Sequence, residues 1–489
     1  MNKIATLLLS LVSLSAASQD YRDLQIMNIW SQSHNPAKIG LYDADASVAS
    51  GLARYEYGDR LTPNDAQKLW GAGIGTEGVK QFGSLSLQGA FSYESKWMEG
   101  ACGSMSTVPG YYPVDIYEFT PGKKELQDYS LSGGIDKALG ENWEIGVLAS
   151  YKSQNYSKRK DLRHTTYHMA MEVTPGILYH RDELRLGATY SFLRNTQSIS
   201  AEELGISSGV YYAFLDKGAG FGNYDIWDNS SVHLKASGVS GFPIEENGHR
   251  LAFQLGWSDM VYGDVSASYH KGRNGEKQKI WFDFSGYELS SSIAFSFGES
   301  YLHAEYSFRR KDNLENILED VTQNGITITH NYGSLSVDSR QNNDFTLSWT
   351  TLSHKGFMIN ASATYADEKE LVSIKYPFLY SRHIQSAGAR LSGRYDISRI
   401  RIGVECGFRK GWSDENEWKS SEIQTSDSPY RLEEYNNSIM AFRLGPFVDA
   451  RAILRYTLPW NMYLEYNARY NSVKDLHRWG HTLGIGYNF

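Results

Sequence analysis

The chain has 489 residues and a formal net charge of −8, and this charge argues against nucleic-acid binding. Its mean hydropathy is −0.46, and beyond the first residues no apolar run is long enough for a membrane-spanning helix. Its 34 Tyr, 20 Phe, 12 Trp and 45 Gly with only 11 Pro are typical of membrane β-barrels, although soluble β-sandwich arrays share part of this composition.

Residues 1–18 have the pattern of a secretory signal peptide. Lys3 gives a positive start, Ile4 to Leu14 form an apolar core, and small residues up to Ser18 offer a cleavage site. The apolar core is too short to span a bilayer. We therefore expect residues 1–18 to be removed and the mature protein to lie beyond the inner membrane.

Residues 19–45 do not alternate between apolar and polar side chains, and we treat them as a separate N-terminal segment. Two placements are open for this segment, a periplasmic tail or a position inside a barrel lumen. It contains the triplet Asn35-Pro36-Ala37. This triplet resembles the luminal hatch of fatty-acid-transporter-like barrels, and the resemblance covers only these three residues.

Alternation of apolar and polar residues recurs through 46–489, which we predict to form one barrel domain. In 400–409 every second residue is apolar, and the residues between them include Arg401, Glu405 and Arg409. Charges repeated in this way on many strands suit one lipid face and one wet face. We predict an all-β fold, an antiparallel transmembrane β-barrel of about 18 strands within a range of 14–18. The expected strands are 46–57, 69–78, 83–95, 126–138, 142–156, 164–180, 183–197, 226–242, 249–271, 276–298, 300–311, 342–353, 356–368, 383–397, 399–411, 438–457, 460–472 and 478–489.

The connections between these expected strands alternate in length. Those after even-numbered strands are short, such as 140–142 and 458–459, and long ones follow several odd-numbered strands. Outer-membrane barrels have short periplasmic turns and long extracellular loops, and we expect the same arrangement here. The longest expected loops are near 96–125, 198–225, 312–341 and 412–437.

The chain ends in a motif that carries a resemblance of its own. Thr482, Gly484, Tyr487 and the terminal Phe489 resemble the signal by which the barrel assembly machinery recognises the last strand of an outer-membrane barrel. The resemblance implies that machinery and outer-membrane lipid as partners, and the outer membrane of a Gram-negative bacterium as the location. Signal peptide, barrel and terminal signal together resemble the uncharacterised outer-membrane β-barrel families common in Bacteroidota. That resemblance implies no activity.

The alternation also predicts which charged side chains face the lumen. In the C-terminal half of the barrel, nine arginines stand against four carboxylates, which are Glu305, Asp396, Glu405 and Glu465. Such a positive wall would favour anionic solutes through its field and through bidentate contacts. The alternative is that the arginines pair across strands and fill the lumen as structure. The candidates are Arg309, Arg390, Arg394, Arg399, Arg401, Arg409, Arg451, Arg455, Arg469, Glu305, Glu405 and Glu465.

The sequence contains no clear constellation for catalysis or metal binding. His303 and His383 lie near expected strands, but no spacing gives a catalytic triad or a metal-ligand cluster. We predict no enzymatic activity, no metal and no cofactor. Cys102 and Cys406 are too few for a disulfide scaffold, and we expect both to be free thiols.

The predicted function is transport of a small polar or anionic solute across the outer membrane. One alternative is a non-conducting surface or accessory barrel that partners another envelope protein. A barrel hydrolase is the less favoured alternative. Whether residues 19–45 lie inside the lumen bears most directly on the choice.

Overall fold

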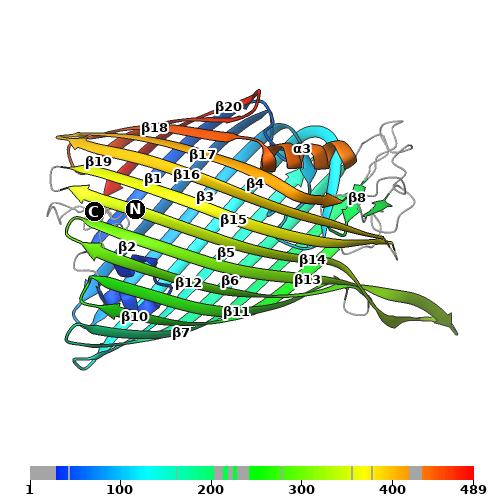
Figure 1. Ribbon diagram of the computed structural model, residues 1–489, viewed down its shortest axis with the longest axis horizontal. Helices are drawn as coiled ribbons and strands as arrows, with labels where there is room; N and C mark the ends of the chain where they lie inside the picture. The colour runs from blue at the N-terminus through cyan, green and yellow to red at the C-terminus, as the bar shows by residue number, and fades with distance from the viewer. Residues whose placement is uncertain are drawn as a thin grey trace, which may run out of the picture.

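The computed structural model describes residues 29–41, 45–160, 162–202, 213–218, 224–227, 242–276, 279–353, 356–375, 378–417 and 432–489. The expected signal peptide and residues 19–28 lie outside these ranges. The described residues form one sheet of 20 strands, of which two short ones, β8 (Ala213–Asp216) and β9 (Tyr224–Trp227), lie outside the barrel wall. The remaining 18 strands close into an antiparallel barrel, so the predicted fold class is confirmed (Figure 1).

The wall strands follow one another around the barrel in chain order, with β7 pairing directly with β10. The first seven are β1 (Ala46–Gly58), β2 (Lys68–Phe82), β3 (Leu85–Ser104), β4 (Asp115–Leu139), β5 (Trp143–Lys158), β6 (Arg163–Arg181) and β7 (Leu184–Glu202). The next six are β10 (Phe242–Trp257), β11 (Val261–Glu276), β12 (Lys279–Phe297), β13 (Ser300–Gln323), β14 (Ile326–Ser353) and β15 (Phe357–Lys375). The last five are β16 (Phe378–Ile397), β17 (Ile400–Glu417), β18 (Phe447–Thr457), β19 (Met462–Val473) and β20 (Leu476–Asn488).

The barrel closes where β20 pairs with β1. The register runs from Val48 opposite Asn488 to Gly58 opposite Arg478. Beyond it, the Ser47 amide donates to the Phe489 carbonyl at 3.0 Å, and the Phe489 amide donates to the Ser47 carbonyl at 2.9 Å. A closed sheet has no unpaired edge, which is the condition for strands to cross a bilayer.

The two ends of the barrel differ in their connections. At one end, which we call the turn end, two to four residues join consecutive strands, as at 83–84, 182–183 and 458–461. The other end, the loop end, carries the connection 105–114, the β8–β9 hairpin and the helix α3 (Leu432–Leu444). In Figure 1 the turn end lies on the left and the loop end on the right.

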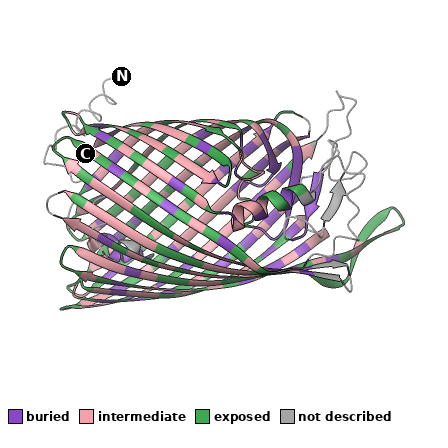
Figure 2. Ribbon diagram, turned by 45° about the horizontal axis from the view of Figure 1, so that its top comes forward, coloured by how far each residue is buried: buried purple, intermediate pink, exposed green. Residues whose placement is uncertain are grey.

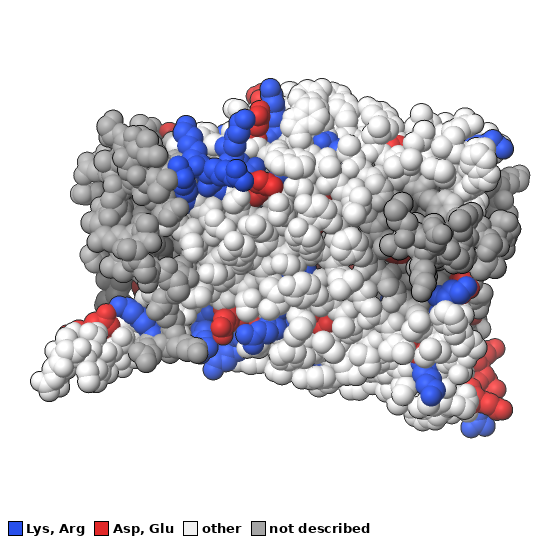
Figure 3. All heavy atoms as spheres, turned by 180° about the vertical axis from the view of Figure 1, so that it is seen from behind, with Lys and Arg blue, Asp and Glu red and all other residues white. Residues whose placement is uncertain are grey.

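Alternate residues of each strand face outward, and the outward ones are apolar over the middle of the barrel. On β10, Phe253 and Leu255 are 60% and 50% exposed, while Ala252 before them and Gln254 between them are buried. Figure 3 shows a broad band largely free of Lys, Arg, Asp and Glu, with charges gathered towards the ends. Such a band suits lipid. None of the described helices is long and apolar enough to cross a membrane.

The strand count of 18 is confirmed, but two of the expected strands are wrong. Expected strand 249–271 is two strands, β10 and β11, joined by a turn at 258–260. The expected strand 226–242 does not form a wall strand, because 224–227 belong to β9 and 228–241 lie outside the described residues. The first part of the expected strand 438–457 is the end of α3.

Two of the expected long loops are largely strand. Residues 312–341 form the outer parts of β13 and β14, which turn at 324–325 and extend beyond the rest of the barrel (Figure 1). Residues 96–104 and 115–125 continue β3 and β4. Both cysteines are free, as predicted, although Cys102 lies in β3 and not in a loop.

Candidate functional site in the barrel lumen

Residues 29–41 lie inside the barrel near the turn end. They form two short helices, η1 (Ile29–Gln32) against β11 and β12, and η2 (Pro36–Leu41) against β3 to β6. Trp30 is 1% exposed and packs edge-on against Tyr262, with the ring centres 4.9 Å apart. The chain passes so close to the wall that an added Cβ at Gly146 would lie 2.7 Å from the Ala37 nitrogen. Only glycine fits there.

Asn35 anchors this luminal segment to two strands. Its side-chain nitrogen donates to the Ile177 carbonyl at 3.0 Å and to Gln254 Oε1 at 3.1 Å. Its side-chain oxygen accepts from the Ala37 amide at 3.0 Å. Asn35 is fully buried, so each of these bonds satisfies a group that water cannot reach. Nearby, burial lowers the pKa of Lys38 to about 8.

The loop end is narrowed by chain that folds inward and forms its own apolar core. Met105, Tyr112 and Leu215 are buried there against wall residues such as Phe282. β8 pairs with the start of β4 and adds a short piece of sheet within this core. Figure 2 shows the buried residues gathered at this end, around β8 and the inner wall.

The tip of connection 105–114 reaches across the lumen to four strands. Tyr111 Oη donates to Glu246 Oε2 at 2.6 Å and accepts from Asn195 Nδ2 at 2.8 Å. Lys311 Nζ donates to the Tyr111 carbonyl at 2.9 Å, and Arg340 Nη1 donates to the Gly110 carbonyl at 3.4 Å. Burial, and then the Glu246 carboxylate, raise the pKa of Tyr111, so its hydroxyl stays a donor. The tip therefore forms a constriction.

Helix α3 also spans part of the loop end. Tyr435 near its start packs against Tyr117 of β4, with ring centres 4.7 Å apart, and accepts from Asn64 Nδ2 at 3.3 Å. At its other end Arg443 bonds Glu368 of β15, and Arg409 of β17 donates to the Phe442 carbonyl at 2.9 Å. Cations at a helix C-terminus are favourable because its carbonyls carry partial negative charge.

A cavity of about 460 Å³ lies between α3, the 105–114 tip and the wall of β14 to β17. Its floor is a network of ions centred on Arg340, whose Nε lies 2.7 Å from Asp338 Oδ2 and 2.9 Å from Glu370 Oε1. Arg382 also bonds Glu370. Burial raises the pKa of Asp216, at the end of β8, to about 7. The cavity therefore has both positive and negative groups and aromatic walls.

The predicted lumen-lining arginines fall into three groups. Several of them pair with carboxylates, which fits the predicted structural alternative for those members. The pairs are Arg309 with Asp344 at 2.6 Å, Arg390 with Glu405 at 2.7 Å, Arg394 with Asp396 at 3.4 Å and Arg401 with Asp396 at 2.7 Å. Two more stack on aromatic rings, Arg409 at 4.9 Å from the Phe442 ring centre and Arg455 at 3.5 Å from that of Tyr463.

Arg399 does not belong to the wall. It is exposed in the two-residue turn between β16 and β17, because β17 begins at Ile400 and not at 399 as expected. Glu305 faces inward on β13, since its neighbour Tyr306 faces outward and is 41% exposed. Glu465 stands directly across from Arg455.

Arg451 and Arg469 form the third group and are directly opposite each other on β18 and β19. Within the described residues Arg451 makes no ion pair or hydrogen bond, and Arg469 Nε donates only to Asn471 Oδ1, at 3.2 Å. Arg451 also lies across from Glu405, which is already paired with Arg390. We call Arg390, Arg451 and Arg469 the arginine ladder. Like charges directly opposite each other on a sheet are destabilising, so sheet stability alone does not account for the Arg451–Arg469 pair.

Sequence reasoning missed Arg340, Arg382 and Arg443. The expected strands began at 342 and 383, just after Arg340 and Arg382, and α3 was not expected. A signal was present for Arg340, because Asp338, Arg340 and Asn342 continue the luminal alternation of β14 upstream.

The two histidines considered for catalysis lie on opposite faces of the wall. His303 faces inward and is buried, and its Nε2 has no hydrogen-bond partner within the described residues. His383 faces outward, where Nε2 bonds Asp367 and Nδ1 lies 2.7 Å from Asp414 Oδ1. Within the described part of the chain, neither ring bonds a serine hydroxyl. The described residues also contain no group of three metal-ligating side chains.

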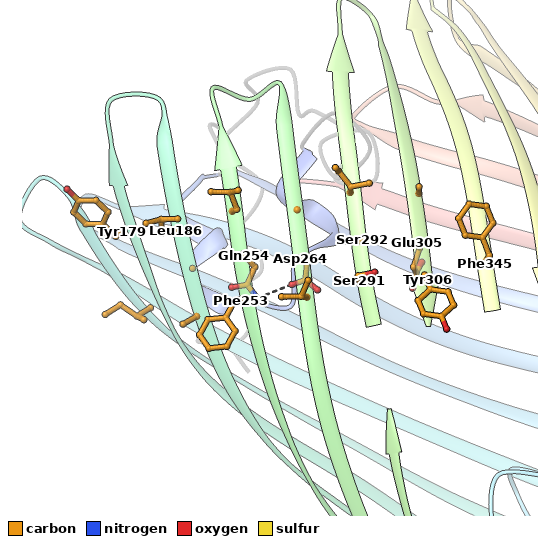
Figure 4. A pocket seen from close by; sticks show the side chains of 18 of the residues that line it. Tyr179, Leu186, Phe253, Gln254, Asp264, Ser291, Ser292, Glu305, Tyr306 and Phe345 are labelled. Carbon is orange, nitrogen blue, oxygen red and sulfur yellow. Dashed lines mark hydrogen bonds between the residues drawn. The ribbon is translucent and has the colours of Figure 1, made fainter. Parts of the chain in front are cut away.

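The outer surface carries an apolar hollow of about 1080 Å³ on the side of β6 to β14. Figure 4 shows its lining, in which Gln254 and Asp264 are joined by a hydrogen bond of 3.0 Å beside the luminal helices. Phe253 and Phe345 belong to the other face and are 60% and 44% exposed. Because its large apolar residues are the outward ones, this hollow faces lipid and is not part of the lumen.

Solved structures similar to this chain include the following three, each from a different bacterium. The FrpB iron transporter of Neisseria meningitidis is 10% identical, with 93% of this chain and 83% of that chain covered and a TM-score of 0.47. The outer membrane transporter YddB of Escherichia coli is 9% identical, with 91% and 81% covered and a TM-score of 0.42. OccK8 (OprE) of Pseudomonas aeruginosa is 11% identical, with 91% and 98% covered and a TM-score of 0.35.

No curated protein matches this chain. A family model described as a family of unknown function, DUF6850, matches residues 36–489. The match begins at Pro36, within the luminal segment, and runs through the whole barrel. The chain belongs to the family of unknown function DUF6850.

Proposed function

We propose that this protein is an outer-membrane channel of a Gram-negative bacterium that transports a small polar or anionic solute. The observation that carries the proposal is the Arg451–Arg469 pair of the arginine ladder, two guanidinium groups opposed across the lumen-facing side of β18 and β19. If the two arginines had only a structural role, each would be expected to pair with a carboxylate, as Arg390 pairs with Glu405. A passing anion would relieve the repulsion and accept bidentate hydrogen bonds.

The position of the ladder fits a route through the barrel. The luminal helices η1 and η2 pack against β3 to β6 and β11 to β12, whereas the ladder lies on β16, β18 and β19. At the loop end the route passes the charged cavity beneath α3, which would serve as a vestibule. The 105–114 tip and residues 29–41 restrict the size of what crosses. Under this proposal the protein acts without catalysis.

Ion selectivity of the purified protein in a planar bilayer tests the proposal. Wild-type channels are expected to prefer anions in a salt gradient. The double substitution Arg451→Gln and Arg469→Gln is expected to lower the anion-to-cation permeability ratio by roughly thirtyfold, because each of the two unit charges, a few ångström away in water, is worth about 1 kcal/mol. Arg451→Lys should keep the field but lose bidentate contact.

A matched control places the same charge change outside the lumen. Lys137 and Lys410 are exposed on the outer face of β4 and β17, so K137Q/K410Q is expected to leave the permeability ratio unchanged. An unchanged permeability ratio in R451Q/R469Q would show that the arginine ladder does not select for anions.

A second candidate, a non-conducting accessory barrel that partners another envelope protein, is favoured by the chain folded into both ends of the lumen. It is distinguished by the same bilayer measurement. A folded barrel that gives no conductance and co-purifies with an envelope protein would support this candidate and refute the channel.

We also propose that Thr482, Gly484, Tyr487 and Phe489 are read by the barrel assembly machinery. Phe489 extends the closing ladder through its two backbone bonds to Ser47. Deleting Phe489 is therefore expected to lower the amount of barrel in the outer membrane several-fold without changing the conductance of the barrels that assemble. Normal outer-membrane levels of the deleted protein, measured by fractionation and immunoblot, would contradict this.

A further inference from the structure

We infer that a patch of basic side chains at the loop end of β4 to β6 binds the phosphate groups of an anionic lipid headgroup. The basic patch consists of Lys123, Arg159, Lys160 and Arg163. Its residues lie on the outer face, at the edge of the apolar band that contacts lipid. The inference depends on the membrane location of the barrel and not on its conductance.

The register of three neighbouring strands brings the patch together. Lys124 of β4 pairs with Lys158 of β5, and Lys158 pairs with His164 of β6. One residue further, on the opposite face, Lys123 of β4 and Arg163 of β6 lie on either side of Arg159, the first residue after the end of β5. Lys160 follows Arg159 at the rim, and an added Cβ at Gly122 would be 3.7 Å from the Lys160 Cβ.

The charged side chains on the two faces of this row differ in how they are paired. On the inner face Lys124 and Lys158 share the buried Glu118, at 3.0 Å and 2.5 Å. On the outer face Lys123 is 85% exposed and approaches only Glu99, at 3.5 Å. Arg159 and Lys160 are also exposed, whereas Arg163 lies across from Glu202 of β7 and Glu125 on the same face of β4 accepts from Gln127. Repeated like charges on adjacent strands repel each other unless an anion lies between them.

The same strands do not show this excess at the turn end. There the outward and turn residues of β4 to β6 include Lys137 and Arg181 but also Glu141 and Asp182, and Arg181 lies 3.9 Å from Asp182. The charges at that end therefore balance. On the face drawn in Figure 3, Lys and Arg side chains likewise gather near the loop end of the uncharged band.

The surroundings favour a lipid over a soluble anion as the occupant. Tyr167 on β6 is 61% exposed and Tyr129 on β4 is 41% exposed, both outward and on the band side of the patch. Exposed aromatic residues of this kind lie at the level of headgroups. A phosphorylated lipid would place its acyl chains on the apolar band and its phosphate among the four cations.

Native mass spectrometry of the intact protein in a neutral detergent tests the inference, with phosphatidic acid as the probe. The wild-type protein is expected to retain bound phosphatidic acid. K123Q/R159Q/K160Q is expected to bind it roughly 100-fold more weakly at low salt, since each basic side chain at a membrane surface contributes about fivefold. The conservative variant K123R/R159K/K160R should bind like the wild type.

K137Q/R181Q/R399Q is the matched control, because it removes three exposed cations at the turn end. It is expected to bind phosphatidic acid like the wild type. Equal binding by the patch variant and the wild type would overturn the inference, and so would equal loss in patch and control variants. Displacement of the lipid by equimolar inorganic phosphate would show a soluble-anion site instead and would also overturn it.

Discussion

The two ends of the lumen are narrowed by different chemistry. At the turn end, residues 29–41 rest on the apolar contacts of Trp30 and Ile39 and on the hydrogen bonds of one amide, Asn35. At the loop end, the 105–114 tip, β8 and α3 combine an apolar core with ions arranged around Arg340. The first closure depends mainly on apolar contacts and amide hydrogen bonds, although Lys38 bonds the Ser33 carbonyl there, and the second depends mainly on ion pairs.

This difference indicates how each constriction responds to its surroundings. Hydrogen bonds between neutral, buried amides change little with pH or ionic strength. Interactions between ionised groups depend on pH through their protonation, and the exposed ones also weaken with salt. We therefore expect the restriction at the loop end to depend more strongly on pH and salt than the restriction at the turn end.

The largest effect is expected from removing Asn35, which anchors the luminal segment at the turn end. Asn35→Ala deletes the bonds to Ile177 and Gln254 and leaves Gln254 and the Ile177 carbonyl without this partner. Docking of residues 29–41 is expected to weaken by about 2 kcal/mol, because unsatisfied buried groups carry a desolvation cost. Hydrogen exchange in 29–41 should rise roughly thirtyfold in consequence.

The neighbouring residue supplies the control for that change. His34 is exposed, so His34→Ala is expected to leave exchange in 29–41 as it is in the wild type. The conductance of Asn35→Ala should also increase, while the exchange of α3 should stay constant. Unaltered exchange in 29–41 would show that apolar packing alone holds the segment.

Much of the wall could be predicted from the sequence because each strand residue faces either lipid or the lumen. Alternation fades where the outer face also becomes wet, beyond the apolar band. The outer parts of β13 and β14 were therefore expected to be loop, and Arg340 was missed with them. Helix α3 has polar and apolar contacts at the mouth and lacks a clean apolar stripe, so its end was mistaken for strand.

The candidate site could be predicted only in part. The side of the barrel wall that a residue faces follows from its own strand, whereas its ion-pair partner depends on the register of neighbouring strands. Arg390 and Arg451 lie on the inner face of the barrel, and that facing follows from the alternation along one strand alone. That Arg390 is paired and Arg451 is not depends on the register of β16, β17 and β18. The position of residues 29–41 depends on distant residues such as Gly146 and Gln254. No local pattern in the segment encodes those contacts.

A smaller effect is expected at the loop end, where Asp216 makes the closure depend on pH. Its carboxyl is 3% exposed and accepts from the Gly218 amide at 3.1 Å. Burial raises its pKa from 3.8 to about 7, against the opposing influence of Arg340 and with Glu370 and Asp115 adding to the rise. The folded state therefore holds a proton that the unfolded state releases above about pH 4.

The sign of the pH dependence follows from this order of pKa values. Docking of β8 is most favourable below the unfolded pKa and weakens as the pH rises through about 7. Hydrogen exchange in 213–218, corrected for intrinsic rates, is thus expected to be slower at pH 5 than at pH 8. Asp216→Asn, which cannot ionise, should remove most of this difference in 213–218. A pH dependence that persists in Asp216→Asn would assign it to Asp115, which lies across from Asp216 on β4, or to Asp338 or Glu370, which pair with Arg340. The conditional nature of the loop end would then depend on the network as a whole.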